Sequence, residues 1–255
     1  MPPRRRLFLA ALLALALAEN AGAQNPPSAL PAPILPGIGA HDPRVRIDPN
    51  SAPWRAVGKL QANAGNLHAT CTGTLIGPKT VLTAAHCVFN SRTRRNFAPG
   101  AIHFLIGFGG GSFAGHALVT DIKVGAGYDP NEGRKTLGSD WAILTLDTPL
   151  GTPDRVLTLR DRPLEVASTI MIGGYSQDHA QVLTADTECR IVGRAADAGG
   201  QPLLRHNCTG THGVSGAPVL VREGTIWRIG GVDVAAEAGV ASGVAVPLDE
   251  TRKLF

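Results

Sequence analysis

The sequence predicts an all-β protein built as two β-barrels of about a hundred residues each, and three features support this. Short runs of apolar and β-branched residues recur along the chain, separated by Gly, Pro and Asn, which is typical of sandwiches and barrels. Long stretches with the period of a helix are missing from the pattern. A proline-bearing link at residues 148–153 divides the runs into two sets, so we expect barrels at 54–147 and 148–255.

The runs predict the individual strands of both barrels. In the first barrel the expected strands are 56–60, 69–76, 80–83, 102–106, 117–124 and 141–146. In the second barrel they are 167–172, 181–185, 187–192, 203–207, 217–221, 225–234 and 243–246. The only helix that the pattern favours is a short one from Leu248 onward.

The N-terminus has the three parts of a secretory signal peptide: Arg4-Arg5-Arg6, the apolar run 7–18 and the small residues 21–23. We expect residues 1–23 to be the signal peptide, cleaved after Ala23. The run is short for a membrane span. A partial match to a twin-arginine signal leaves the export route open, although a basic region for unfolded export is the simpler interpretation.

Residues 24–53 are rich in proline and show no period, which predicts an extended or disordered lead-in. This segment is either a propeptide, trimmed after Arg44 or Arg46, or a tail on the surface. Loss of residues 1–23 removes three arginines and one glutamate, so the formal charge falls from +4 to +2. This small charge predicts no nucleic-acid partner, and the mature chain has no second apolar run that could enter a membrane.

Cys71, Cys87, Cys189 and Cys208 all lie in the exported part, where disulfides form and persist. Four cysteines allow three connectivities. Nearness in sequence favours Cys71–Cys87 and Cys189–Cys208, with a zinc site as the alternative. Because the close Cys-x-x-Cys pairs of zinc sites are missing, we expect no metal.

Three separate segments carry residues suited to nucleophilic catalysis. Ser215 lies in a loop with glycines at 213 and 216, which permit the tight turn that exposes a nucleophile. His86 follows an apolar strand in Thr-Ala-Ala-His-Cys, and Asp140 precedes one in Asp-x-Ala-Ile-Leu. Each residue alone has an ordinary structural explanation, as a hairpin loop, a buried histidine or a strand cap. Together they supply a nucleophile, a base and an orienting acid.

His86, Asp140 and Ser215, in this order and in these motifs, resemble the triad segments of the chymotrypsin-like serine proteases. The resemblance covers residues 54–247 and implies two six-stranded antiparallel β-barrels with the active site in the cleft between them. Pro-Trp before the first strand and Cys-Thr-Gly-Thr-Leu-Ile-Gly-Pro at 71–78 look most like the bacterial glutamyl endopeptidase branch.

The resemblance implies a role for each matching residue. Ser215 attacks the scissile carbonyl, His86 transfers the proton, and Asp140 orients His86. The N–H groups of Gly213 and Ser215 match the oxyanion-hole donors. The positions that match substrate-binding residues are Thr209, Gly210 and Thr211 on one wall of the primary pocket, His212 facing the cleft, and Asp233, Val234, Ala235 and Ala236 on the strand that pairs with the substrate.

Two positions depart from this resemblance. Val214 stands where digestive members have an aspartate that pairs with a new N-terminus, so activation by that ion pair is not available. Asp233 stands where the glutamyl endopeptidases have a histidine that helps to hold the substrate glutamate. A carboxylate there repels glutamate, so a basic or a small side chain is an alternative specificity.

The sequence therefore predicts a secreted or periplasmic serine endopeptidase, a monomer that cleaves polypeptides through an acyl-enzyme intermediate without a cofactor. The alternative from another class is a protease-like binding protein, which is disfavoured because no triad residue is missing. An esterase of the α/β-hydrolase type is disfavoured because its chain order of Ser, Asp and His is absent.

Overall fold

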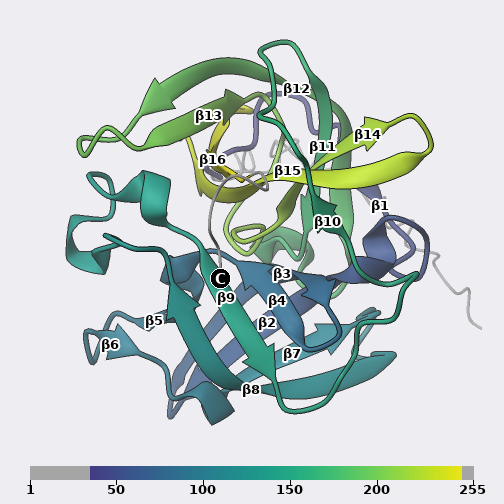
Figure 1. The fold of residues 1–255 in the computed structure, drawn as a ribbon, viewed down its shortest axis with the longest axis vertical. Coiled ribbons are helices and arrows are strands. Elements are labelled where there is room, and N and C mark those ends of the chain that lie inside the picture. Colours follow the sequence, from purple (N-terminus) through teal and green to yellow (C-terminus); the bar gives the residue numbers. More distant parts are fainter. Residues whose placement is uncertain (1–34, 249–255) are drawn as a thin grey trace, which may run out of the picture. The chain divides into compact units, whose positions relative to one another are not determined.

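The structure, a computed structural model, describes residues 35–248 of the 255-residue chain. Its strands form two barrels in sequence order, drawn from purple to teal and from green to yellow in Figure 1. The prediction of two six-stranded antiparallel barrels is confirmed. Leu248, where a helix was predicted to begin, is not helical; the rest of that helix and the signal peptide lie outside the described residues.

The first barrel is a closed ring of strands in the order β2-β3-β4-β9-β8-β7. Its members are β2 (Val57–Ala64), β3 (Leu67–Gly77), β4 (Thr80–Thr83), β7 (Ile102–Ile106), β8 (Gly115–Val124) and β9 (Ala142–Leu146). Its interior contains fully buried Leu60, Leu75, Phe104 and Leu144, each contributing about 2 kcal/mol by burial. Gly58 of β2 leaves the space that the Phe104 ring fills.

The second barrel closes through β12–β13 pairing, in the ring order β12-β11-β14-β15-β16-β13. Its members are β11 (Thr169–Gly174), β12 (Thr184–Ala196), β13 (Pro202–His206), β14 (Pro218–Glu223), β15 (Ile226–Ala236) and β16 (Gly243–Pro247). Two further short strands extend this sheet, β1 (Val45–Arg46) beside β12 and β10 (Thr158–Leu159) beside β15.

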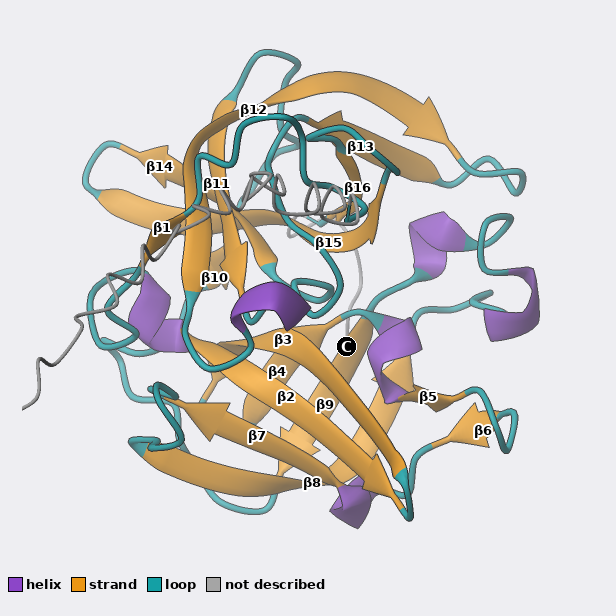
Figure 2. Ribbon diagram, turned by 180° about the vertical axis from the view of Figure 1, so that it is seen from behind, coloured by secondary structure: helices purple, strands orange, loops and turns teal. Residues whose placement is uncertain are grey.

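The connections contain the remaining elements of the described chain. Strands β5 (Phe89–Asn90) and β6 (Arg95–Asn96) form a separate hairpin. Figure 2 shows the helical segments as short turns between strands, and all six are 3-10 helices. They are η1 (Trp54–Ala56), η2 (Ala85–Val88), η3 (Pro99–Ala101), η4 (Pro130–Glu132), η5 (Leu137–Ser139) and η6 (Gln177–His179). No helix in residues 35–248 is long and apolar enough to cross a membrane.

The strand prediction was wrong at residues 181–192. Two strands were expected, but a single strand, β12, begins at Thr184 and continues to Ala196. Asp186 does not break this strand because it pairs with Ile172 of β11. Its buried carboxylate also accepts the N–H groups of Glu188 and Thr209. Asp186, whose polar side chain predicts a turn, thus lies inside a strand with its hydrogen bonds made.

The described part of the lead-in, residues 35–53, is held against the second barrel. The N–H of Gly37 donates to the Glu237 carbonyl at 2.7 Å, and the Gly37 carbonyl accepts the N–H of Gly210 at 3.1 Å. Residues 45–46 pair with β12. A cut after Arg44 or Arg46 would therefore separate contacts that the folded second barrel uses, and trimming of this segment stays a prediction.

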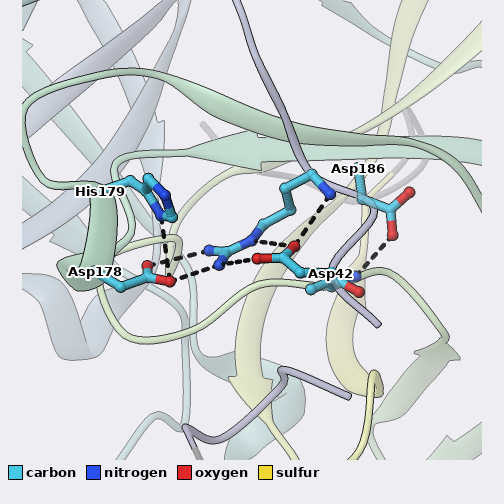
Figure 3. Close-up of polar contacts among 6 residues, drawn as sticks. Asp42, Asp178, His179 and Asp186 are labelled. Atoms are coloured by element: carbon cyan, nitrogen blue, oxygen red, sulfur yellow. Dashed lines mark hydrogen bonds and ion pairs between the residues drawn. The ribbon is translucent and has the colours of Figure 1, made fainter. Parts of the chain in front are cut away.

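An arginine of the lead-in is central to this attachment (Figure 3). The guanidinium of Arg44, with its side chain only 3% exposed, donates to the carboxylates of Asp42 and Asp178. The hydrogen bond from Arg44 lowers the pKa of Asp42. Burial raises the pKa of Asp178, but Arg44 outweighs burial and the net change is downward. The two carboxylates thus remain charged and bind the lead-in to η6, which contains Asp178.

Both predicted disulfides are present, Cys71–Cys87 in the first barrel and Cys189–Cys208 in the second. His86 and the sulfur atoms of Cys71 and Cys87 lie within 4.8 Å of one another, a spacing that a metal ion could bridge. Because both sulfurs are joined in the disulfide, neither is a thiolate that could bind a metal.

Candidate active site

His86 is held in place by the turn that follows β4. It lies in η2, and the next residue is joined to β3 through Cys71–Cys87. Its backbone N–H donates to Asp140 Oδ1 at 2.9 Å, and its ring Nδ1 lies 2.7 Å from Asp140 Oδ2. Asp140 therefore fixes both the backbone and the ring, and Nε2 has no partner among residues 35–248.

Asp140 follows η5, and its side chain is 4% exposed. Its backbone N–H donates to the Leu137 carbonyl, which closes the short helical turn. The same turn is fixed from the second barrel, because the buried N–H of Gly138 donates to Asp197 Oδ2 at 2.9 Å. Both barrels thus determine where the Asp140 carboxylate lies.

The environment of His86 favours its charged form. Burial lowers its pKa, but the hydrogen bond with Asp140 and the negative charges of Asp140 and Asp233 outweigh burial and raise the pKa above its ordinary value. The imidazole is therefore a stronger base than a free histidine.

Ser215 lies between the second disulfide and β14, on a loop that the first barrel supports. The N–H of Thr72 on β3 donates to the Ser215 carbonyl at 2.9 Å, and the Thr72 hydroxyl donates to the Gly213 carbonyl at 2.9 Å. The side chain of Ser215 is half-buried. Its hydroxyl makes no hydrogen bond with another described residue, so it is free to bond with a substrate or with His86.

Glycine is required on both sides of Ser215. Gly213 has φ +95° and Gly216 has φ +84°, which are conformations that L side chains rarely adopt. A Cβ at Gly213 would also collide with the Tyr175 carbonyl, and one at Gly216 with the Thr72 carbonyl. In this turn the N–H groups of Gly213 and Ser215 find no acceptor among residues 35–248. They are available to bind an oxyanion.

A cavity of about 310 Å³ brings most of the predicted site residues together. His86 and Ser215 line it, and so do Val214 and the predicted substrate-binding residues Thr211, His212, Asp233, Val234, Ala235 and Ala236. Thr209 and Gly210 line a smaller neighbouring cavity, which also reaches Asp233, Ala235 and Ala236. We call these two cavities the cleft and the inner pocket.

Val214 packs into the core of the second barrel instead of forming an ion pair. It is buried among apolar residues that include Ile172 and Val219. Its N–H donates to the Thr211 carbonyl at 3.0 Å, and it lies beside Gly210. The loop is therefore held by apolar packing and by Thr72, together with the lead-in contact from Gly37 to Gly210.

Sequence reasoning missed His206, which lies at the inner pocket and pairs with Asp233. His206 is the last residue of β13, and no motif surrounds it. Its partner is 27 residues away in sequence and two strands away in the sheet. Only the order of the strands brings the two together, so the local sequence holds no signal for the pair.

Two barrels of this kind, with the His–Asp pair facing a serine loop across one cleft, define the class of chymotrypsin-like serine proteases. The family model described as Trypsin matches residues 44–253. The protein belongs to the Trypsin family.

Curated relatives support this assignment. Glutamyl endopeptidase of Bacillus licheniformis is 28% identical over 174 residues, which are 63% of this chain and 48% of the relative. Chymotrypsin-like elastase family member 3B of Homo sapiens is 36% identical over 86 residues, which are 34% of this chain and 28% of the relative. The chain thus spans about half the length of the first relative and less of the second.

Solved structures share the fold. A Glu endopeptidase in complex with MPD matches with a TM-score of 0.68 at 24% identity, covering 84% of this chain and 94% of that chain. The protease Anisep from Arthrobacter nicotinovorans matches with a TM-score of 0.58 at 16% identity, covering 76% of this chain and 90% of that chain.

Proposed function

We propose that the protein is an exported serine endopeptidase in which Ser215 is the nucleophile, His86 the general base and acid, and Asp140 the residue that orients His86. One observation carries this proposal. His86 bonds with both Asp140 oxygens through its backbone N–H and its Nδ1, so its Nε2 remains open in the cleft that Ser215 also lines. Membership of the Trypsin family supports a polypeptide substrate.

In the first half of the reaction, Ser215 Oγ forms a bond to the carbonyl carbon of the scissile peptide while His86 Nε2 takes the hydroxyl proton. The carbonyl oxygen becomes negative and accepts hydrogen bonds from the N–H groups of Gly213 and Ser215. Loss of one such donor commonly raises the barrier by ~3 kcal/mol. His86 then gives its proton to the leaving amine, the C–N bond breaks, and an acyl-enzyme remains on Ser215.

In the second half, water attacks the ester carbonyl while His86 takes a proton from it. The same N–H groups bind the second oxyanion, and the proton on His86 returns to Ser215 Oγ as the C–O bond breaks. Asp140 keeps the proton of neutral His86 on Nδ1 throughout, because its Oδ2 is an acceptor at 2.7 Å. Its negative charge also stabilises the imidazolium in each half.

Export is the second part of the proposal. The two disulfides among residues 35–248 are of a kind that persists in oxidising compartments. The signal pattern in residues 1–23 supports the same location. Mass spectrometry of the intact secreted protein, with and without thiol alkylation, tests both statements by giving the processed N-terminus and the absence of free thiols.

The experiment that tests catalysis compares the wild-type protein with Ser215→Ala on a mixed peptide library. We expect kcat to fall by a factor on the order of 10⁶, because a triad without its nucleophile keeps only the contribution of binding and the oxyanion hole. Ser112→Ala, at an exposed serine between β7 and β8, is the matched control and should leave kcat unchanged.

A fluorophosphonate probe separates an enzyme from a protease-like binding protein. Labelling that maps to Ser215 and is lost in Ser215→Ala supports the enzyme. Correctly folded, processed protein that neither reacts with the probe nor cleaves the library would establish the binding protein instead.

A further inference from the structure

A second His–Asp pair lies beneath the cleft. His206 Nε2 lies 2.9 Å from Asp233 Oδ1, and the two side chains are only 3% and 5% exposed. Asp233 lines both the cleft and the inner pocket, whereas His206 lines only the inner pocket. The carboxylate is therefore the member of this pair that reaches the place where a substrate side chain would lie.

The hydrogen bonds fix the tautomer of His206. His206 Nδ1 accepts the backbone N–H of Cys208 at 3.3 Å, so Nδ1 carries no proton. The ring proton is then on Nε2 and is donated to Asp233. With both nitrogens used, His206 has no donor left for a substrate carboxylate. The negative charge of Asp233 acts on His86, and Asp233 Oδ2 has no hydrogen-bond partner among residues 35–248.

Small residues on β16 make room for this arrangement. β16 lies between β13 and β15, with Gly243 opposite His206 and Ala245 opposite Asp233. A Cβ at Gly243 would lie 2.5 Å from His206 Cε1. The His206 ring thus crosses β16 over a glycine. A register shift between Asp233 and Ala235 also marks β15 at this point, and such irregularities often re-aim a side chain next to a site.

Among residues 35–248, the rest of the lining offers hydroxyl groups, which can donate or accept, but no permanent cation. No lysine or arginine of the described residues lines the cleft or the inner pocket. The buried hydroxyls of Thr209 and Thr211 have no partner in the described part of the chain. In the described part of the chain, His86 and His212 are the other titratable groups of the cleft, and the proposed function uses His86 as a base. The inner end of the site is thus negative.

We propose that Asp233, held by His206, selects substrates with a lysine or arginine side chain immediately before the scissile bond, the P1 position. This inference rests on the proposed function and names its substrate class. A cationic side chain in the cleft, which Asp233 also lines, would donate to Asp233 Oδ2 and compensate its charge. A glutamate there would meet the charge of a buried carboxylate, with neutral threonine hydroxyls nearby but no lysine or arginine among residues 35–248 to offset the repulsion. The P1 preference proposed for this chain thus differs from the one that the name glutamyl endopeptidase gives for its relative.

The test uses the full exported protein and peptides that differ only at P1, with Lys, Arg, Met, Gln or Glu. We expect kcat/KM for Lys or Arg to exceed that for Met by about tenfold or more, the value of one charge-assisted hydrogen bond, and Glu to be poorest. Asp233→Asn should reduce the Lys-to-Met ratio by about the same factor. A preference for Glu, or a ratio that Asp233→Asn does not change, would overturn the proposal.

A binding measurement makes the result independent of catalysis. Calorimetry of Ser215→Ala with benzamidinium and with benzoate should show tighter binding of the cation by about tenfold or more, and the further change Asp233→Asn should remove the difference. Equal binding, or tighter binding of benzoate, overturns the pocket assignment. If benzamidinium is preferred but no peptide is cleaved and no fluorophosphonate labels Ser215, the proposed function fails while the pocket assignment stands.

Discussion

The two His–Asp pairs of this protein contain the same chemical groups in opposite arrangements. In the pair His86–Asp140, the histidine uses both oxygens of the aspartate, and the open atom is Nε2. In the pair His206–Asp233, both nitrogens of the histidine are used, and the open atom is Asp233 Oδ2. The first pair thus presents a base to the cleft, and the second presents an anion.

Exposure separates the pairs further. The side chain of His86 is 35% exposed, whereas that of His206 is 3% exposed. A histidine that exchanges protons with a substrate must face the cleft, but a histidine that only holds a carboxylate can be buried. Hydrogen-bond saturation and burial, and not residue type, decide which member of each pair can react.

The largest effect is expected from Asp140→Asn. The amide would no longer accept the Nδ1 proton of His86, so the ring would shift to the tautomer that cannot take a proton at Nε2. We expect kcat to fall by ~10⁴ with little loss of folded protein. Steady-state kinetics on a peptide with a neutral P1 residue measures this, with Asp161→Asn, at an exposed carboxylate, as the control. A variant that keeps most of its kcat would remove Asp140 from the mechanism.

The next effect distinguishes the pairs by stability. His206→Phe leaves the buried Asp233 carboxylate without its donor, so we expect the free energy of unfolding to fall by about 3–5 kcal/mol. Urea denaturation at neutral pH measures this. The matched change His86→Phe should cost less, because His86 faces the cleft. Addition of Asp233→Leu to His206→Phe should recover part of the loss. An equal loss of unfolding free energy in both variants would show that burial of the pair His206–Asp233 adds nothing to its effect on stability.

The smallest effect is a coupling between the pairs. The charge of Asp233 contributes to the raised pKa of His86, as does that of Asp140. Because His86 acts as a base when neutral, activity should appear as the pH rises through this raised pKa. Asp233→Asn should shift the acidic limb of kcat/KM to lower pH, measured with a neutral P1 residue. Asp121→Asn, at an exposed carboxylate on β8, is the control and should leave the limb in place. A shift to higher pH would contradict the coupling.

The fold was largely predictable because its strands are local patterns. All six strands of the first barrel lie where the runs of apolar residues placed them. The error at Asp186 arose because a polar residue between two runs reads as a break, whereas here the N–H groups of Glu188 and Thr209 satisfy it. Burial of a carboxylate depends on donors that arrive from elsewhere in the chain, and the sequence pattern does not show them.

The lead-in shows the same limit. Its prolines predicted an extended segment, and β1 is extended, but composition could not indicate that Gly37 would bond with Gly210 and Glu237. Nor could it indicate that Arg44, read as a place for trimming, would lie buried between Asp42 and Asp178. These contacts join residues separated by more than a hundred positions, except for that between Arg44 and Asp42.

By itself, the sequence predicted the strands of the two barrels, favoured both disulfides and marked the motifs around His86, Asp140 and Ser215, because strand patterns and motifs are local and the two cysteines of each pair are only 16 and 19 residues apart. The tertiary structure alone decided that His206 bonds with Asp233 and that Asp233, not His206, lines the cleft. The physical reason is strand register: the contact exists only because β13, β16 and β15 are adjacent and Gly243 leaves space between them.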